Sequence, residues 1–142
     1  LSDPFTRARM YEASAWLRAH AVEARAHPVY TNLKLLDAYL RRSGALPGVE
    51  VRCFVQEDNL RELAEWTNPR NGQRDKVLEL VRWRFYGVGA FPGDLVNGGA
   101  PAGSLLVLED DPRLTLVGTD AFLAAHTTVL ERTPQLTIAV LR

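Results

Sequence analysis

The most acidic short stretch of the chain reads VLEDDP, from residue 107 to residue 112. Carboxylate oxygens are the ligands that hard divalent cations prefer. A metal-dependent enzyme site could therefore use Glu109, Asp110, Asp111 and Asp120. The same stretch also suits a hairpin turn, because Asp and Pro favour turns on backbone grounds. We expect the turn and keep the metal-dependent enzyme as an alternative prediction.

A second candidate is the segment RWRFY, residues 82 to 86. On a strand, Arg82, Arg84 and Tyr86 share one face, and guanidinium groups beside an aromatic ring suit phosphate contact and base stacking. In the alternative, Trp83 and Phe85 fill the core while the arginines pair with carboxylates. The first interpretation predicts a nucleic-acid-associated accessory module, which we keep as an alternative function.

The glycine-rich stretch YGVGAFPGDLVNGGAPAGS, residues 86 to 104, holds six of the ten glycines. A dinucleotide-binding fingerprint needs glycine at its sixth position, where this chain has Pro92, and no lysine follows as in a phosphate-binding P-loop. We expect a long loop here, with Phe91 and Asp94 as further binding candidates.

The remaining reactive side chains do not complete a known catalytic or metal set. His20 and His27 are seven residues apart and share one side of a predicted helix, but no cysteine or carboxylate completes a metal set at recognised spacing. Cys53 lies on the apolar side of a predicted strand, as a core thiol would. We predict no catalytic residue, no metal and no cofactor.

Periodicity predicts the elements that position these groups. We expect helices over 2–26, 32–42 and 120–132, and strands at VEVRCFVQ, RWRFY, LLVLEDD, RLTLVG and QLTIAVL. This alternation predicts an α/β domain: a small mixed sheet of about four to five strands flanked by helices, with a long N-terminal helix. We expect one domain over 1–142, with a helical part over 1–44 and an α/β core over 49–142, cut from a larger protein.

The first predicted helix carries two apolar stripes where a surface helix usually has one. The first stripe consists of Ala8, Tyr11, Ala15, Ala19 and Val22. The second contains Met10, Ala13, Leu17, Ala21 and Ala24. Two stripes fit a helix between two layers of one domain, and they equally fit a subunit interface. The interface hypothesis uses Met10, Leu17, Ala21 and Ala24.

Residues 49–118 resemble one half of a phospholipase D-like domain. The resemblance rests on VEVRCFV, a helical spacer, RWRFYG, a loop and AGSLLVLEDDPRLTLVGT. In that family the strand opens with His-x-Lys, and the corresponding positions here are Ala102 and Ser104. The resemblance therefore implies a degenerate, non-catalytic member of the kind found fused to regulatory domains.

Composition sets the broad class. The chain has 142 residues, 17 basic and 17 acidic side chains, and one cysteine. Balanced charge does not favour nucleic acid as a partner, and no apolar run is long enough to span a membrane. The single cysteine cannot form an internal disulfide, so nothing argues for an oxidising compartment and a cytoplasmic setting is the default. We expect a non-enzymatic regulatory or protein-interaction domain of a larger cytoplasmic bacterial protein, self-associating through its first helix.

Overall fold

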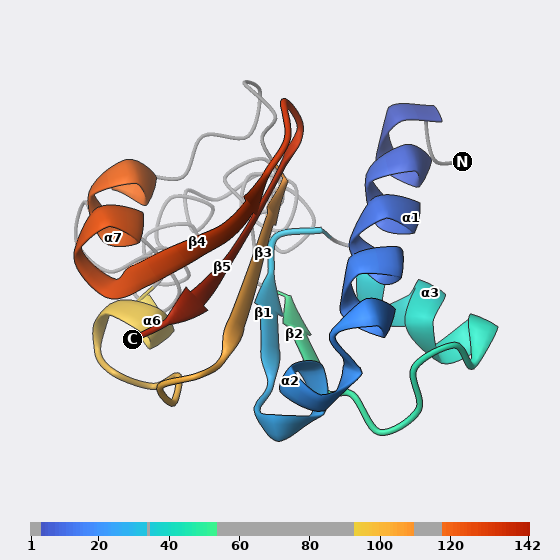
Figure 1. The fold of residues 1–142 in the computed structure, drawn as a ribbon, viewed down its shortest axis with the longest axis horizontal. Helices are drawn as coiled ribbons and strands as arrows, with labels where there is room; N and C mark the ends of the chain where they lie inside the picture. The colour runs from blue at the N-terminus through green and yellow to red at the C-terminus, as the bar shows by residue number, and fades with distance from the viewer. Residues whose placement is uncertain (1–3, 34, 54–92, 110–117) are drawn as a thin grey trace, which may run out of the picture. The chain divides into compact units, whose positions relative to one another are not determined.

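The computed structural model describes residues 4–33, 35–53, 93–109 and 118–142. These residues form a mixed five-stranded sheet with helices, which confirms the predicted α/β class (Figure 1). In chain order the elements are α1 Pro4–Ala19, α2 Ala21–Ala26, β1 Val29–Thr31, α3 Leu36–Ser43, β2 Val51–Cys53, α6 Gly93–Val96, β3 Leu105–Glu109, α7 Thr119–His126, β4 Thr127–Arg132 and β5 Leu136–Leu141.

The chain divides into two compact units, each assembled from separate stretches of sequence. The first unit comprises residues 1–54, 100–110 and 126–142, so it holds the described sheet together with α1, α2 and α3. The second comprises residues 55–99 and 111–125, of which the structure describes α6 and most of α7.

The strand order of the sheet is β2-β1-β3-β5-β4. Strand β1 pairs in parallel with both β2 and β3, and Tyr30 lies opposite Arg52 on one side and Leu106 on the other. The parallel pair β1 and β2 needs a crossover connection, which contains α3. Strand β5 pairs antiparallel with both β3 and β4, and β4 has a bulge between Val129 and Glu131.

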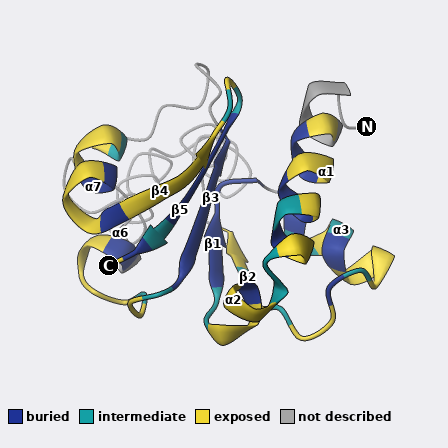
Figure 2. Ribbon diagram, in the orientation of Figure 1, coloured by how far each residue is buried: buried dark blue, intermediate teal, exposed yellow. Residues whose placement is uncertain are grey.

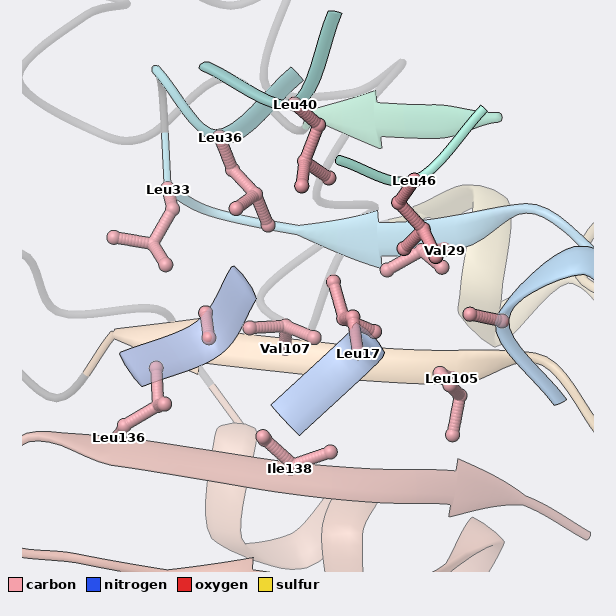
Figure 3. Packing of buried hydrophobic residues seen from close by; sticks show 12 residues of the cluster. Leu17, Val29, Leu33, Leu36, Leu40, Leu46, Leu105, Val107, Leu136 and Ile138 are labelled. Atoms are coloured by element: carbon pink, nitrogen blue, oxygen red, sulfur yellow. The ribbon is translucent and has the colours of Figure 1, made fainter. Parts of the chain in front are cut away.

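The core of the first unit lies between its helices and one face of the sheet. Val107 and Ile138 are opposite in the β3–β5 register, so both side chains point to the same face. Figure 3 shows Leu17 of α1 beside Val107, with Leu36 of α3 in the same cluster. Each of these side chains is fully buried, and burying one side chain of this size stabilises the fold by about 1.5–3 kcal/mol.

The N-terminal helix is shorter than predicted, because it breaks at His20 into α1 and α2. The backbone at His20 has φ −122° and ψ 43°, outside the helical region. The Trp16 carbonyl accepts both the His20 backbone N–H, at 3.1 Å, and the His20 ring Nδ1, at 2.8 Å. The chain thus turns around a side-chain contact that no glycine or proline marks in the sequence.

Two strands were absent from the sequence-based prediction. Strand β1 has only three residues, too few to show a period, and the helix expected from Asn32 begins at Leu36 instead. The helix expected to reach Arg132 ends at His126, and Thr127–Arg132 forms β4. The start of β4 is rich in β-branched residues, which suit a strand, and its pairing with β5 overrides the helical pattern.

The remaining predictions concern the strand that contains Cys53, the glycine-rich stretch and two further strands. The strand expected over residues 49–56 is confirmed over Val51–Cys53, but Cys53 is exposed, so its assignment as a core thiol was wrong. In β2, the outermost strand on its side of the described sheet, Val51 is half-buried against the core, while Arg52 and Cys53 are exposed. The glycine-rich stretch contains the short helix α6. The predicted strands RWRFY and RLTLVG lie outside the described residues, apart from Gly118 at the end of the second.

Candidate ligand-binding pocket

A pocket of about 650 Å³ opens in the first unit between the α1–α2 helices and strands β3, β4 and β5. We call it the Trp16 pocket. Its lining is mainly apolar, with four ionisable side chains, and consists of Trp16, His20, Glu23, Ala26, His27, Gly103, Leu105, Leu130, Glu131 and Val140. The break between α1 and α2 places His20 and His27 on this one pocket, although no metal set includes them among the described residues.

His20 is held in a defined orientation on Trp16. Their rings stack with centroids 3.7 Å apart and planes 11° from parallel. A carbonyl oxygen can only accept, so the 2.8 Å contact with the Trp16 carbonyl requires a proton on His20 Nδ1. In the neutral imidazole, Nε2 is then an acceptor, and this is the ring atom that His20 can offer to a ligand.

The second imidazole, that of His27, lies against Gly103 at the end of the glycine-rich stretch. A β-carbon at Gly103 would lie 3.1 Å from His27 Cδ2 and 3.2 Å from Nε2, and the backbone there has φ 93°. The Gly103 N–H donates to the Leu141 carbonyl at 2.8 Å, and the Leu141 N–H donates to the Ser104 carbonyl at 2.9 Å. The glycine therefore makes room for the ring while β5 holds this part of the loop in place.

Two carboxylates complete the polar part of the pocket. Glu23 comes from α2 and Glu131 from β4, and both are exposed. Neither has an ion-pair or hydrogen-bond partner within the described ranges. An apolar pocket with a few unpaired polar groups is suited to binding a small molecule.

The structure places the residues of the interface hypothesis in or against the chain's own core. Met10 is 6% exposed, while Leu17 and Ala24 are not exposed at all, and Ala21 packs against the same cluster. The stripe that contains them therefore faces the sheet. The other stripe is the exposed one: Tyr11 is 53% and Val22 81% exposed. Figure 2 shows exposed residues along both α1 and α2.

The predicted Arg and aromatic site falls largely outside the described residues. Arg82, Arg84, Tyr86 and Phe91 lie there. Asp94 is the second residue of α6, but its side chain is not described. Binding of nucleic acid at these residues stays a prediction.

The acidic residues of the predicted metal-dependent site do not share one environment. Glu109 is 9% exposed and forms a buried ion pair with Arg9. Asp110 and Asp111 lie outside the described residues, and Asp120 is exposed near the start of α7. Of these residues, Glu109 thus has a partner within the fold and a structural role.

This ion pair belongs to a polar cluster at the carboxyl ends of β1 and β3. The Asn32 side chain accepts the Glu109 backbone N–H at 2.6 Å and donates to the Glu109 carbonyl at 3.2 Å. The Asn32 side chain thus continues the hydrogen bonding between β1 and β3 just beyond the end of β1. Sequence reasoning missed Arg9 and Asn32, because their partner lies 100 and 77 residues away in the chain.

Comparison with protein-family models, curated proteins and solved structures gave no match to this chain. Within the described part of the chain, no helix has both the length and the apolar character needed to cross a bilayer. In the positions that correspond to the His-x-Lys motif of the phospholipase D-like family, Ala102 lies in an exposed turn and Ser104 is fully buried just before β3.

Proposed function

We propose that this chain is a non-enzymatic binding domain with a regulatory role, and that it takes a small molecule in the Trp16 pocket. The observation that carries the proposal is an apolar pocket of small-molecule size that contains two carboxylates, Glu23 and Glu131, without a partner in the described part of the chain. Ligand sites typically occupy about 300–1,000 Å³ and combine apolar walls with a few polar groups.

The neighbouring contacts support a preformed site. Trp16 and His20 hold each other by stacking and by the Nδ1 hydrogen bond. Gly103, on the sheet side, is fixed by its bond to Leu141. Because contacts within the protein hold these walls, binding need not supply the free energy to order them.

Nuclear magnetic resonance tests this proposal with three naphthyl probes of matched size: 2-(1-naphthyl)ethylamine, 2-(1-naphthyl)ethanol and 1-naphthylacetate. Small ligands gain about 0.3 kcal/mol per heavy atom, so we expect millimolar binding. At least one probe should shift the indole N–H resonance of Trp16, assigned with a Trp16→Phe variant.

A pair of alanine variants provides the control. Ala26 of α2 and Ala38 of α3 are both exposed helix residues, but only Ala26 lines the pocket. Ala26→Trp should fill the pocket and abolish the shift, while Ala38→Trp should preserve it. The proposal fails if no probe shifts Trp16, or if both variants respond alike.

The exposed stripe supports a second candidate function, self-association. It consists of Ala8, Tyr11, Ala15, Ala19 and Val22, all of them exposed. The first four of these residues lie on α1 and Val22 lies on α2, and exposed apolar side chains that gather on a surface are typical of interaction sites. Sedimentation velocity should show a concentration-dependent dimer that Val22→Glu dissociates and that Val129→Glu, an exposed valine on β4, leaves intact. A monomer up to millimolar concentration contradicts it.

The setting we propose for both functions is a larger cytoplasmic protein. The single cysteine of the chain supports a reducing compartment, because proteins of oxidising compartments commonly carry paired cysteines. Cellular fractionation of the tagged protein tests the location directly.

A further inference from the structure

We infer that the ligand of the Trp16 pocket is an apolar molecule that carries a protonated amine. This inference rests on the proposed binding function and adds the chemical class of the ligand. Three features of the pocket carry it: its charge, the hydrogen-bonding character of its polar atoms, and its size.

The charge of the pocket is the first feature. Glu23 on α2 and Glu131 on β4 contribute two carboxylates to its lining. No lysine or arginine occurs among the described residues that line it. Neither carboxylate has a partner elsewhere in the described chain. A positively charged ligand would provide a counter-charge for these carboxylates, whereas both carboxylates would repel an anionic ligand.

The hydrogen-bonding character is the second feature. Carboxylates accept and cannot donate, and the contact of His20 Nδ1 with the Trp16 carbonyl leaves Nε2 as an acceptor in the neutral ring. Three of the four ionisable groups therefore offer acceptors. A protonated primary amine has three donors and no acceptor, so it matches this set better than an alcohol or a carboxylate does.

The size of the pocket argues for a small molecule. The lining away from these polar groups is apolar, and includes Leu105 and Val140 from the sheet and Leu130 from β4. A volume of about 650 Å³ accommodates a ligand of ordinary small-molecule size. The expected ligand thus places an apolar body against the strands and its ammonium group between α2 and β4.

The three naphthyl probes distinguish this inference from the binding function itself, because they differ in charge and share one ring system. We expect the ethylamine to bind about tenfold more tightly than the neutral ethanol, and the acetate to bind most weakly. Glu23→Gln and Glu131→Gln should each reduce the amine affinity about threefold and leave the alcohol affinity unchanged. Glu12→Gln is the matched control, because Glu12 is an exposed α1 residue outside the pocket lining.

The outcomes separate the two proposals. If alcohol and amine bind equally and neither glutamate variant matters, the binding function stands and the ligand class is wrong. If the acetate binds best, the ligand class is again wrong. If no probe shifts the Trp16 resonance, the binding function itself fails. Unchanged circular dichroism of the two variants, both at exposed positions, confirms that they fold.

Discussion

The imidazole of His27 occupies the space that a side chain at position 103 would need. A β-carbon on Gly103 would approach His27 Cδ2 to 3.1 Å, at a backbone φ of 93°. The contact joins the end of α2 to the start of β3 across 76 residues of sequence, and it forms part of the wall of the Trp16 pocket.

Gly103→Ala should therefore destabilise the protein for two reasons, backbone strain and the contact with His27. We expect a loss of about 2–4 kcal/mol in the free energy of unfolding, measured by urea denaturation. In a His27→Ala background the same change should cost at least about 1 kcal/mol less, because only the strain is left. Gly44→Ala is the control for strain alone, since Gly44 has φ 63° and nothing within 4 Å of its β-carbon position. Equal costs in both backgrounds would contradict the contact.

The buried ion pair of Arg9 and Glu109 predicts a second effect. Glu109→Ala leaves the Arg9 guanidinium in a site where its side chain is 8% exposed, and we expect a loss of about 3–5 kcal/mol. The exposed pair of Arg41 and Asp37 provides the comparison, where Asp37→Ala should cost at most about 1 kcal/mol. Chemical denaturation measures both. If Glu109→Ala and Asp37→Ala lower the free energy of unfolding by similar amounts, then removing one partner of a buried ion pair costs no more than removing one partner of an exposed pair.

Asn32 predicts a third effect through the backbone of Glu109. Asn32→Ala leaves the N–H and carbonyl of Glu109 without these side-chain bonds, at a cost of about 1–3 kcal/mol. Asn32→Asp can still accept from the N–H but cannot donate to the carbonyl, so we expect it to be destabilising too. Hydrogen exchange of the Glu109 amide should accelerate in Asn32→Ala. Exposed Asn97 is the control, and exchange that is equally slow in Asn32→Ala and Asn97→Ala would contradict this role.

The two helix stripes predict a fourth effect. Leu17→Glu places a charge in the core, where Leu17 is completely buried, and should unfold the protein. Val22→Glu changes a side chain that is 81% exposed, and should alter the stability of the monomer by at most about 0.5 kcal/mol. Thermal unfolding followed by circular dichroism compares them. A folded Leu17→Glu protein would show that this stripe is a surface.

Much of the fold follows from local sequence alone. The apolar runs predicted β3 and β5 correctly. The helix expected to end at residue 42 ends at Ser43, where Gly44 adopts φ 63° and its N–H donates to the Leu40 carbonyl at 3.2 Å. These features depend on residues a few positions apart. Strands β1 and β4 were missed because three residues carry no period and because pairing with β5 overrides a helical pattern.

The Trp16 pocket also depends partly on local sequence and partly on contacts between distant residues. The sequence by itself determined that His20 and His27 lie close in the chain and that the first helical segment has two apolar stripes. It could not decide which stripe faces the sheet, because both have similar hydrophobicity and only contact with Val107 and Ile138 distinguishes them. Nor could it place Gly103 and Glu131 beside the histidines. Gly103 and Glu131 are brought to the pocket by the pairing of β3 with β5 and of β5 with β4. The free energy of that pairing depends on residues distant in sequence, so only the tertiary structure decides which residues meet at the pocket.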